Sequence, residues 1–364
     1  MKKINIPLSH KPYNVFIGEN IFPNLLERIK KQNLKGNLFF IIDKKVYSLY
    51  KNQITNLFDS SDERIYHIIL RADEASKSFT SLQKIFRKML SLKLGRDSVI
   101  ITLGGGIIGD IAGFAASNFM RGVSYVQVPT TLLSAVDSSV GGKTGINFYD
   151  TKNVIGSFYQ PEFVMIDTSF FDTLPEEELL CGIGEIVKYA FLSNKKFFGD
   201  VKNNIDNIYF RERKTLNRII SESVKLKSGV VIQDEREKDL RKILNLGHTF
   251  AHAFEVEQNY KIKHGHAVIV GISCALYLSK RLGILADEKL KYCLTLLRKF
   301  EGQIKIKAVD KRKVYSIMFR DKKNRDGKIK FVLLKDVGEI IVDVQASKDD
   351  IYYSLSEGIK LFQH

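Results

Sequence analysis

The sequence predicts an α/β N-terminal domain with a parallel Rossmann-like sheet, followed by a mainly α-helical C-terminal domain. Short apolar runs alternate with amphipathic stretches in the first half of the chain, which is typical of parallel strands joined by crossover helices. After about Pro175 strand patterns become rare and long helical patterns take over. A chain of 364 residues is long enough for two domains, which we expect at residues 1–174 and 175–364.

The expected strands of the first domain are short and largely apolar, as in strands that are buried on both faces of a sheet. They cover residues 15–17, 37–42, 65–70, 98–103 and 124–128, and a helical pattern covers 78–92. In the second domain the helical patterns cover residues 176–191, 216–233, 247–257 and 265–282. Two further apolar runs, at 330–334 and 339–342, predict a small hairpin.

The charge of the chain has two interpretations. A net charge of +16 would suit a nucleic-acid-binding protein, because clustered basic residues release counterions from phosphate backbones. The basic residues are, however, interspersed with 41 acidic residues along nearly the whole chain, which is typical of solvated faces. We therefore expect no nucleic-acid partner and favour an anionic small substrate, drawn to a positively charged cleft.

The cysteines and the lengths of the apolar runs predict the cellular compartment in which the protein is found. Cys181, Cys274 and Cys293 are odd in number and lack metal-type spacing, which indicates reduced thiols in a cytoplasmic protein. No apolar run is long enough for a signal peptide or a membrane span, so we expect no membrane partner.

A glycine-rich segment, Gly104-Gly105-Gly106-Ile107-Ile108-Gly109-Asp110, follows one expected strand and opens a helix. This context favours a dinucleotide pyrophosphate site over an ordinary tight turn. In a Rossmann fold the acidic residue for a ribose hydroxyl comes after the glycines, whereas here Asp43, at the end of an earlier strand, matches it better. The strand order must therefore differ from the Rossmann order.

Four of the seven histidines lie within nineteen residues, from His248 to His266. On a helix His248 and His252 share one face, and His264 from the next element could complete a metal site that takes its fourth ligand from elsewhere. Glu185 and Lys188 are one helical turn apart and by themselves would form an ordinary ion pair.

A further polar segment runs from Asp137 to Asn147, after Pro129-Thr130-Thr131-Leu132-Leu133. Its glycines could bring backbone amides, a lysine and an aspartate to one ligand. A P-loop is excluded, because Asp137 stands where the first glycine of that motif is required and no strand directly precedes it.

Together these motifs resemble the 3-dehydroquinate synthases, the shikimate-pathway members of the sugar phosphate cyclases. The resemblance runs from about Asp43 to Leu334. Its motifs lie at residues 104–106 with Gly109 and Asp110, 120–122, 129–133, Asp137 with 141–147, 184–185 with Lys188, 245–250 with His252, and 264–265.

The resemblance implies a catalytic zinc or cobalt ion held by Glu185, His248 and His264. Two imidazoles and a carboxylate leave a coordination position open, as in catalytic zinc sites. His252 would then help to remove a substrate hydroxyl proton instead of binding the metal.

The family's reaction converts 3-deoxy-D-arabino-heptulosonate 7-phosphate to 3-dehydroquinate and phosphate. It combines transient oxidation by bound NAD, phosphate elimination, hydride return and an intramolecular aldol closure. The residues implied for NAD are Asp43, Glu74, Lys77, Gly104, Gly105, Gly106, Gly109, Asp110, Thr130, Thr131, Lys143, Lys152 and Thr173. Those implied around the substrate are Lys143, Asn153, Lys188, Lys227, Arg241, Asn245 and Lys322, which is chosen over Lys323. Asp137 would organise these cations, and Arg121 would reach the phosphate of a neighbouring subunit, which implies a homodimer.

The chain departs from the family pattern in two places. His266 stands where glutamate is common, so it could support His264 or compete with it for the metal. Residues 148–151 replace a more usual polar loop before Lys152.

Three alternatives remain. A related cyclase that makes an inosose or valiolone ring would differ at the positions of Arg241, Asn245 and His252. A metal-dependent polyol dehydrogenase would release NADH. A nucleic-acid-binding or regulatory protein that uses NAD as a ligand would need a contiguous basic face.

Overall fold

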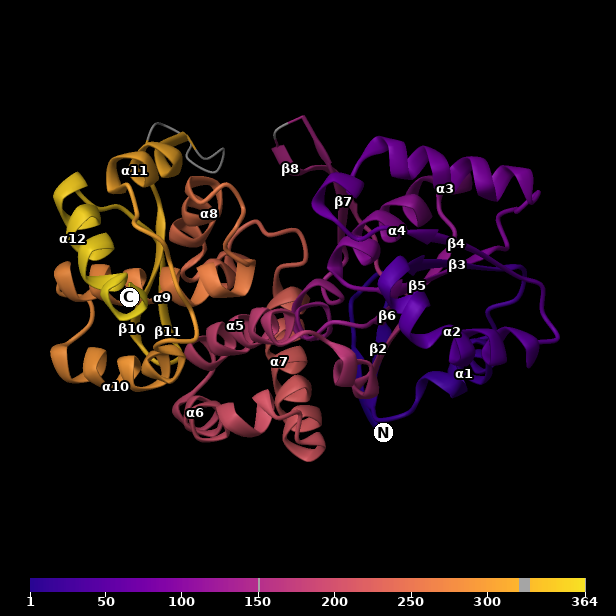
Figure 1. The fold of residues 1–364 in the computed structure, drawn as a ribbon, viewed down its shortest axis with the longest axis horizontal. Coiled ribbons are helices and arrows are strands. Elements are labelled where there is room, and N and C mark those ends of the chain that lie inside the picture. Colours follow the sequence, from indigo (N-terminus) through magenta and orange to yellow (C-terminus); the bar gives the residue numbers. More distant parts are fainter. Residues whose placement is uncertain (150, 321–327, 364) are drawn as a thin grey trace. The chain divides into compact units, whose positions relative to one another are not determined.

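The computed structural model describes residues 1–149, 151–320 and 328–363, which form two compact units (Figure 1). The first unit comprises Met1–Pro175 and Leu216–Ile232, and the second comprises Glu176–Thr215 and Gln233–His364. This division differs from two continuous domains at 1–174 and 175–364, because Leu216–Ile232 packs with the first unit. No helix in the described ranges is both long enough and apolar enough to span a bilayer.

A seven-stranded sheet forms the centre of the first unit, with the strand order β1-β2-β9-β6-β5-β3-β4. The strands are parallel to their neighbours except for the antiparallel pair β1 and β2. Their bounds are β1 Lys2–Ile6, β2 Tyr13–Gly18, β3 Leu38–Asp43, β4 Ile65–Leu70, β5 Val99–Gly104, β6 Ser124–Pro129 and β9 Phe163–Asp167. The five strands predicted from apolar runs are confirmed as β2 to β6.

The strand order places a candidate ligand site. If β3, β4, β5, β6 and β9 are numbered 1 to 5 along the chain, their order across the sheet is 2-1-3-4-5. The direction of winding therefore reverses between β3 and β5. This is not the Rossmann order, as expected from the position of Asp43. In open α/β sheets ligands bind at such a reversal, beyond the carboxyl ends of the strands. Asp43 ends β3 and Gly104 ends β5, so both residues lie at that edge.

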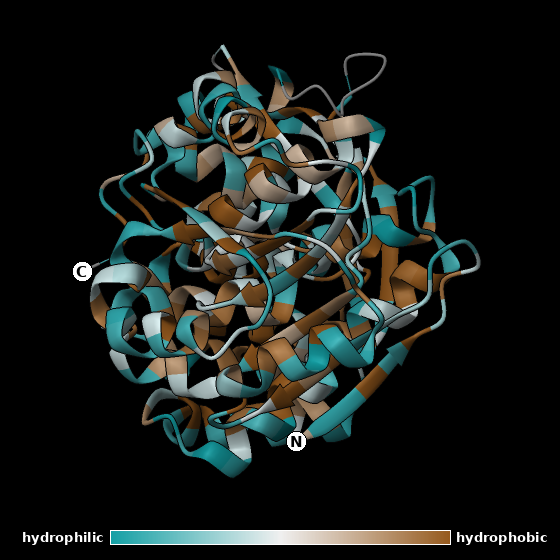
Figure 2. Ribbon diagram, turned by 90° about the vertical axis from the view of Figure 1, so that its right-hand side faces the viewer, coloured by the Kyte–Doolittle hydropathy of each residue, from teal (hydrophilic) through white to brown (hydrophobic). Residues whose placement is uncertain are grey.

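Helices accompany this sheet in the first unit. They are α1 Leu25–Lys31, α2 Lys44–Asp59, α3 Phe79–Ser91, α4 Gly106–Asn118 and most of α7 Arg213–Gln233. Phe39, Ile100 and Ile111 belong to a core in which α3 and α4 pack against the strands. In Figure 2, which faces this unit, the strands are mostly hydrophobic and the surrounding helices carry hydrophilic residues. Burial from both sides explains the continuous apolar runs in the sequence.

A separate hairpin of β7 (Lys143–Phe148) and β8 (Thr151–Phe158) packs on α4, and neither strand was predicted. Short helical turns complete both units: η1 Phe22–Asn24, η2 Glu74–Ser76, η3 Phe119–Arg121, η4 Ser134–Ser138, η5 Thr168–Thr173, η6 Leu240–Asn245, η7 Arg298–Phe300 and η9 Lys360–Phe362.

The second unit is mainly helical and contains the predicted hairpin, so the predicted fold class is confirmed for both units. Its elements are α5 Glu176–Leu192, α6 Lys195–Tyr209, α8 His248–Glu257, α9 His264–Arg281, α10 Asp287–Leu297, α11 Lys311–Arg320, α12 Lys348–Gly358, β10 Phe331–Asp336 and β11 Glu339–Val344. Helix α9 is the centre of this unit, since it contacts α5, α8, α10, α12 and β10.

Glycines allow α5 and α8 to approach α9 closely. A Cβ atom on Gly265 would collide with the carbonyl oxygen of Cys181, and one on Gly184 would collide with the carbonyl oxygen of Gly265. A Cβ atom on Gly271 of α9 would likewise collide with the carbonyl oxygen of Gly247, just before α8. These contacts fix the positions of the residues next to them, which are Glu185, His264 and His248.

Candidate active site

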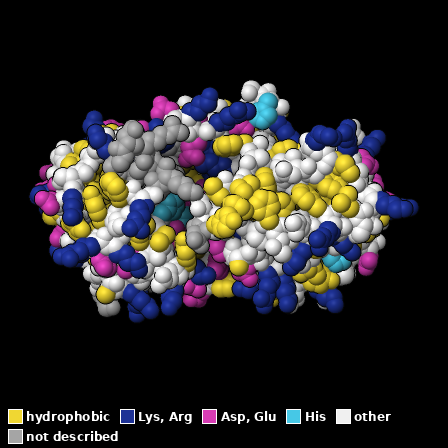
Figure 3. Space-filling model, turned by 90° about the horizontal axis from the view of Figure 1, so that it is seen from above, with side chains coloured by type: hydrophobic (Ala, Val, Ile, Leu, Met, Phe, Trp, Pro, Cys, Tyr) yellow, Lys and Arg dark blue, Asp and Glu magenta, His cyan; other side chains and the backbone are white. Residues whose placement is uncertain are grey.

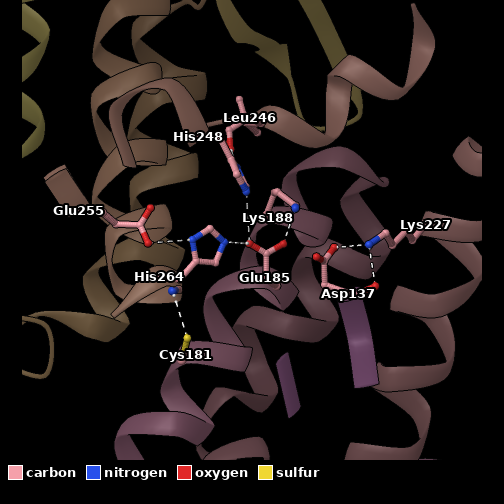
Figure 4. A network of polar contacts seen from close by, with 10 residues as sticks. Asp137, Cys181, Glu185, Lys188, Lys227, Leu246, His248, Glu255 and His264 are labelled. Atoms are coloured by element: carbon pink, nitrogen blue, oxygen red, sulfur yellow. Dashed lines mark hydrogen bonds and ion pairs between the residues drawn. The ribbon is translucent and has the colours of Figure 1, made fainter. Parts of the chain in front are cut away.

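Three side chains from three helices of the second unit converge on one point (Figure 4). Glu185 lies in the middle of α5, while His248 and His264 are the first residues of α8 and α9. The Oε1 atom of Glu185 is 3.6 Å from Nε2 of His248 and 3.4 Å from Nε2 of His264. One ligand atom from each residue lies within 4.8 Å of the other two.

The other ring nitrogen of each histidine fixes the orientation of its ring. Nδ1 of His248 is 3.2 Å from the carbonyl oxygen of Leu246, and Nδ1 of His264 is 3.4 Å from Oε1 of Glu255. A carbonyl or a carboxylate can only accept a hydrogen bond, so each Nδ1 must donate. Both Nε2 lone pairs then face a carboxylate oxygen, and three acceptors at these distances fit a cation between them.

The two histidines have different electrostatic surroundings. Burial, together with the nearby Lys188 ammonium, lowers the pKa of His248 well below its usual value. Burial also opposes the charged form of His264, but hydrogen bonds to Glu185 and Glu255 outweigh it and raise the pKa of His264 to about 10. In the absence of a metal, a proton on Nε2 of His264 would bridge the ring to the Glu185 carboxylate as a hydrogen bond.

Lys188 forms a buried ion pair with Oε2 of Glu185, and their side chains are 3% and 0% exposed. The expected i, i+3 pair on α5 is therefore present. This ion pair uses Oε2 of Glu185, while Oε1 faces the two histidines. The Glu185 carboxylate therefore lies between the Lys188 ammonium and two imidazole rings.

His252 lies beside this group. Its ring centroid is 5.4 Å from that of His248 and 6.2 Å from that of His264. Among the described residues a second group of potential ligands, His252, Glu255 and His264, overlaps the first group at His264. Glu255 was missed in the sequence, although its i+3 spacing from His252 on a helix was a usable signal.

Arg241 and Asn245 lie in η6, just before the His248 helix. Arg241 is 2% exposed; its backbone N–H donates to Oδ2 of Asp234 over 3.0 Å, and its guanidinium donates to the carbonyl oxygen of Glu235. The amide of Asn245 donates to Glu237 over 3.2 Å. Lys322, also predicted for the substrate, lies outside the described residues.

In the first unit the glycine turn has the geometry expected of a dinucleotide site. Gly104 ends β5, Gly105 is the N-cap of α4, and the backbone N–H of Thr130 donates to the carbonyl oxygen of Gly104 over 3.0 Å. A Cβ atom on Gly105 would lie 3.1 Å from Thr131, and one on Gly106 would lie 2.9 Å from Ser138. Side chains are excluded there, so backbone N–H groups at the start of α4 can face an anionic ligand. Gly109 and Asp110 follow in the next turn of α4.

Asp43 lies at the same edge of the sheet, where its carboxylate caps α2 by accepting from the backbone N–H of Lys45 over 2.8 Å. Thr173 lies by another part of α2, with its hydroxyl 2.8 Å from that of Tyr50.

A polar network ties the β7 and β8 hairpin to the rest of the first unit. Lys77 donates to Asp110 and to Asn153. Asn147 donates to Glu74 over 2.7 Å and accepts from the backbone N–H of Asn153 over 2.9 Å. Burial raises the pKa of Asp110, and the Lys77 ammonium opposes that rise.

The remaining predicted residues of the first unit lie on α7, on two helical turns and on the hairpin. Lys227 of α7 donates to the backbone oxygen and to Oδ1 of Asp137, each over 2.6 Å (Figure 4). Lys143 begins β7 and is exposed, and Lys152 lies on β8. Arg121 is exposed in η3, with a left-handed φ of +69°.

Comparisons with known proteins agree with these features. The 3-dehydroquinate synthase N-terminal domain matches residues 67–181, and the 3-dehydroquinate synthase C-terminal domain matches residues 182–324. The chain is 38% identical over 341 residues to the 3-dehydroquinate synthase of Alkaliphilus metalliredigens, covering 93% of this chain and 94% of that protein. It is 41% identical over 345 residues to the 3-dehydroquinate synthase of Endomicrobium trichonymphae, covering 94% of each chain.

The fold also agrees with that of a solved structure. A crystal structure of 2-deoxy-scyllo-inosose synthase, complexed with carbaglucose-6-phosphate, NAD+ and Co2+, superposes with a TM-score of 0.89 at 24% identity. The superposition covers 98% of this chain and all of the other. With two matched domains and long alignments at this level of identity, the chain belongs to the 3-dehydroquinate synthase family.

Proposed function

We propose that this protein is a 3-dehydroquinate synthase, which converts 3-deoxy-D-arabino-heptulosonate 7-phosphate to 3-dehydroquinate and phosphate. The observation that carries the proposal is the convergence of Glu185, His248 and His264 beside the buried Lys188. The relatives of the same name, aligned over nearly the whole chain, support the choice of this reaction within the fold.

We infer that Glu185, His248 and His264 hold a divalent cation, zinc or cobalt. The donor set fits, since two neutral imidazoles and a carboxylate are usual ligands of catalytic zinc. A bound cation would supply Lewis acidity toward a substrate hydroxyl. The cobalt ion in the crystal structure of 2-deoxy-scyllo-inosose synthase supports a metal in this fold. His252, one helical turn after His248, is the residue that we assign to removing the hydroxyl proton.

We also infer that the first unit binds NAD at the carboxyl ends of β3, β5 and β6. The backbone N–H groups at Gly105 and Gly106 would receive the pyrophosphate, and Asp43 would face a ribose. NAD would supply a reversible hydride acceptor. The other NAD residues stay predictions: Glu74, Lys77, Gly104, Gly109, Asp110, Thr130, Thr131, Lys143, Lys152 and Thr173.

The substrate residues stay predictions in both units. They are Lys188, Arg241 and Asn245 in the second unit, Lys143, Asn153 and Lys227 with Asp137 in the first, and Lys322. An anionic substrate needs such cations, and the planar guanidinium of Arg241 is suited to a carboxylate or a phosphate. On the face seen in Figure 3, Lys and Arg side chains are scattered among acidic and hydrophobic ones, so this face does not present the contiguous basic surface that a nucleic acid requires.

A homodimer is the assembly that we propose. Exposed apolar side chains of α3 and of the hairpin, among them Phe79, Phe148 and Phe158, lie on the first unit, and Figure 3 shows hydrophobic side chains gathered there. Large apolar patches of this kind mark interaction surfaces. Tyr159, next to Phe158, donates a hydrogen bond from its hydroxyl to the carbonyl oxygen of Val123, two residues after Arg121, over 2.8 Å. We keep a cytoplasmic location as a prediction, consistent with three buried free cysteines.

One assay tests the proposed reaction. The purified protein, loaded with zinc and supplied with NAD and the heptulosonate phosphate, should release phosphate and form the carbocyclic acid. Absorbance of reduced nicotinamide should stay flat meanwhile, because the hydride that is removed must return to the same substrate. A rise in NADH in step with substrate consumption would instead indicate a polyol dehydrogenase. Formation of an inosose or valiolone from its own sugar phosphate would indicate a different cyclase.

A further inference from the structure

Glu255 is a buried carboxylate that none of the roles above uses. It lies on α8, two helical turns after His248, and its side chain is 11% exposed. Its Oε1 atom is 3.4 Å from Nδ1 of His264, on the side of the imidazole opposite Glu185 (Figure 4). The His264 ring therefore lies between two carboxylates, one on each of its nitrogen atoms.

This arrangement fixes the tautomer of His264. Because Nδ1–H donates to Glu255, the lone pair on Nε2 faces Glu185 and His248. A partner on the far nitrogen also makes an imidazole more basic as a ligand. At His248 the partner of Nδ1 is the neutral carbonyl oxygen of Leu246. A charged carboxylate on Nδ1 is therefore a feature of His264 that His248 does not share.

The local charge gives Glu255 a second effect. A cation held by Glu185 would lie close to the buried ammonium of Lys188, which binds the other oxygen of the same carboxylate. Glu185 and Lys188 have opposite formal charges that cancel, so the pair adds no net charge to the site. The charge of Glu255 makes the group net negative, and burial strengthens the attraction.

We propose that Glu255 is a positioning residue that holds His264 in its metal-binding orientation and raises the affinity of the site for the divalent cation. This inference rests on the proposed metal site. Helix α8 therefore carries both His248 and the residue that orients His264.

A rival geometry makes Glu255 a direct ligand together with His252 and His264, whose ligand atoms also lie within 4.8 Å of one another. That set would use Nδ1 of His264 and would leave the convergence at Glu185 unused. The set with Glu185 uses the two nitrogens that are already oriented by acceptors on the far side of each ring, so we favour it.

The test uses Glu255→Gln, which preserves size and one acceptor oxygen but removes the charge. Zinc affinity is measured by competition with a chromophoric chelator, and the cobalt-loaded protein is examined by visible absorption. We expect affinity to fall about 10- to 100-fold. The cobalt spectrum should keep its intensity, since no ligand is lost.

Glu257→Gln is the matched control. Glu257 is on the same helix, and 9% of the whole residue is exposed against 8% of the whole Glu255 residue. Its carboxylate, however, accepts hydrogen bonds from Gln258 and from the backbone N–H of Asp310. The zinc affinity of the Glu257→Gln variant should equal that of the parent enzyme. If Glu255→Gln fails to fold, Glu255→Asp takes its place, because the shorter side chain should also weaken zinc binding.

Two results would overturn the proposal. An unchanged zinc affinity would show that Glu255 does not act on His264. A loss of cobalt absorption as complete as in Glu185→Gln would show that Glu255 is itself a ligand. A parent enzyme that binds no stoichiometric divalent metal would contradict the proposed metal site, and that result is distinguishable because it appears before any substitution is made.

Discussion

His248 and His264 are chemically identical side chains, but the fold shifts their pKa values in opposite directions. Burial and the nearby Lys188 ammonium favour an uncharged ring at His248, whereas two carboxylates surround the ring of His264 and favour its charged form. A metal ion needs neutral imidazole at both positions, so binding must displace a proton from His264 far more than from His248. The difference arises because burial and Lys188 act on His248, whereas Glu185 and Glu255 both hydrogen-bond to His264.

Removal of a proposed ligand should remove the metal. We expect His248→Ala and His264→Ala each to lose stoichiometric zinc in elemental analysis after dialysis, because two remaining ligands hold zinc poorly. A chelator should likewise abolish turnover of the parent enzyme, and zinc or cobalt should restore it. Tight metal retention in both variants would contradict the assignment and point to His252 or His266.

His252 should behave differently from its neighbours. His252→Ala is expected to keep its metal and NAD but to lose activity by about 100- to 10,000-fold, which is the usual contribution of a general base. Turnover with saturating zinc and the metal content of the same sample are the two measurements. Nearly normal turnover with the metal retained would mean that His252 has only a structural role on α8.

At the scale of elements, close helix contacts hold the metal cluster together. Gly265 follows His264 directly, and its Cα approaches the backbone of α5 at Cys181, one turn before Glu185. Any side chain at this position must push α9 away from α5. The distance between Glu185 and His264 would then increase, although neither ligand had been changed.

Gly265→Ala should therefore lower stability by roughly 1–3 kcal/mol, as in other overpacked cores, and should weaken zinc binding. Gly199→Ala in α6 is the control, because a Cβ atom added to Gly199 would have no other atom within 4 Å. That substitution should raise stability by about 0.5–1 kcal/mol, since alanine favours a helix over glycine. Denaturant unfolding of the metal-free proteins measures both effects. Equal stabilities for the two variants would show that the contact of α5 with α9 is not tight.

Among the strands predicted from sequence, the clearest are those that are buried along nearly their whole length. Strands β3 and β5 are buried on both faces and appear as continuous apolar runs. Strands β7 and β8 pair mainly with each other, and Lys143, Lys152 and Gly156 interrupt any apolar pattern, so no strand was predicted there. Their positions depend on the packing of Gly113 against Thr144 and on the network at Asn147.

The metal cluster could be only partly predicted from residues. Spacing on a helix grouped His248 with His252, and His264 was added as a third imidazole. The contact of Glu185 with both His248 and His264 depends on three helices that meet at glycines, which no local pattern contains. Glu185 was proposed as a ligand only through the resemblance to the family. Glu255 remained unnoticed because its partner, His264, is on another helix.

At the scale of the whole molecule, Arg121 is available for a partner. It is exposed in a backbone turn where Met120 and Arg121 both have positive φ, which is unusual for residues with side chains. Within residues 1–149, 151–320 and 328–363, no side-chain hydrogen bond or ion pair of Arg121 is found. The exposed apolar side chains of the neighbouring hairpin provide a surface on which a second copy could pack.

Hybrid dimers test whether Arg121 acts in the neighbouring subunit. Arg121→Ala and Lys188→Ala homodimers should both be inactive, since each of their sites lacks one required cation. After subunit exchange, a hybrid has one site with Lys188 from its own chain and Arg121 from the partner. Random exchange makes half of the dimers hybrids with one intact site of two, so activity should recover to about a quarter of the parent value. Differently tagged subunits and tandem purification would verify the exchange. Recovery should then require both variants, and an absence of recovery in purified hybrids would mean that Arg121 serves the site of its own chain.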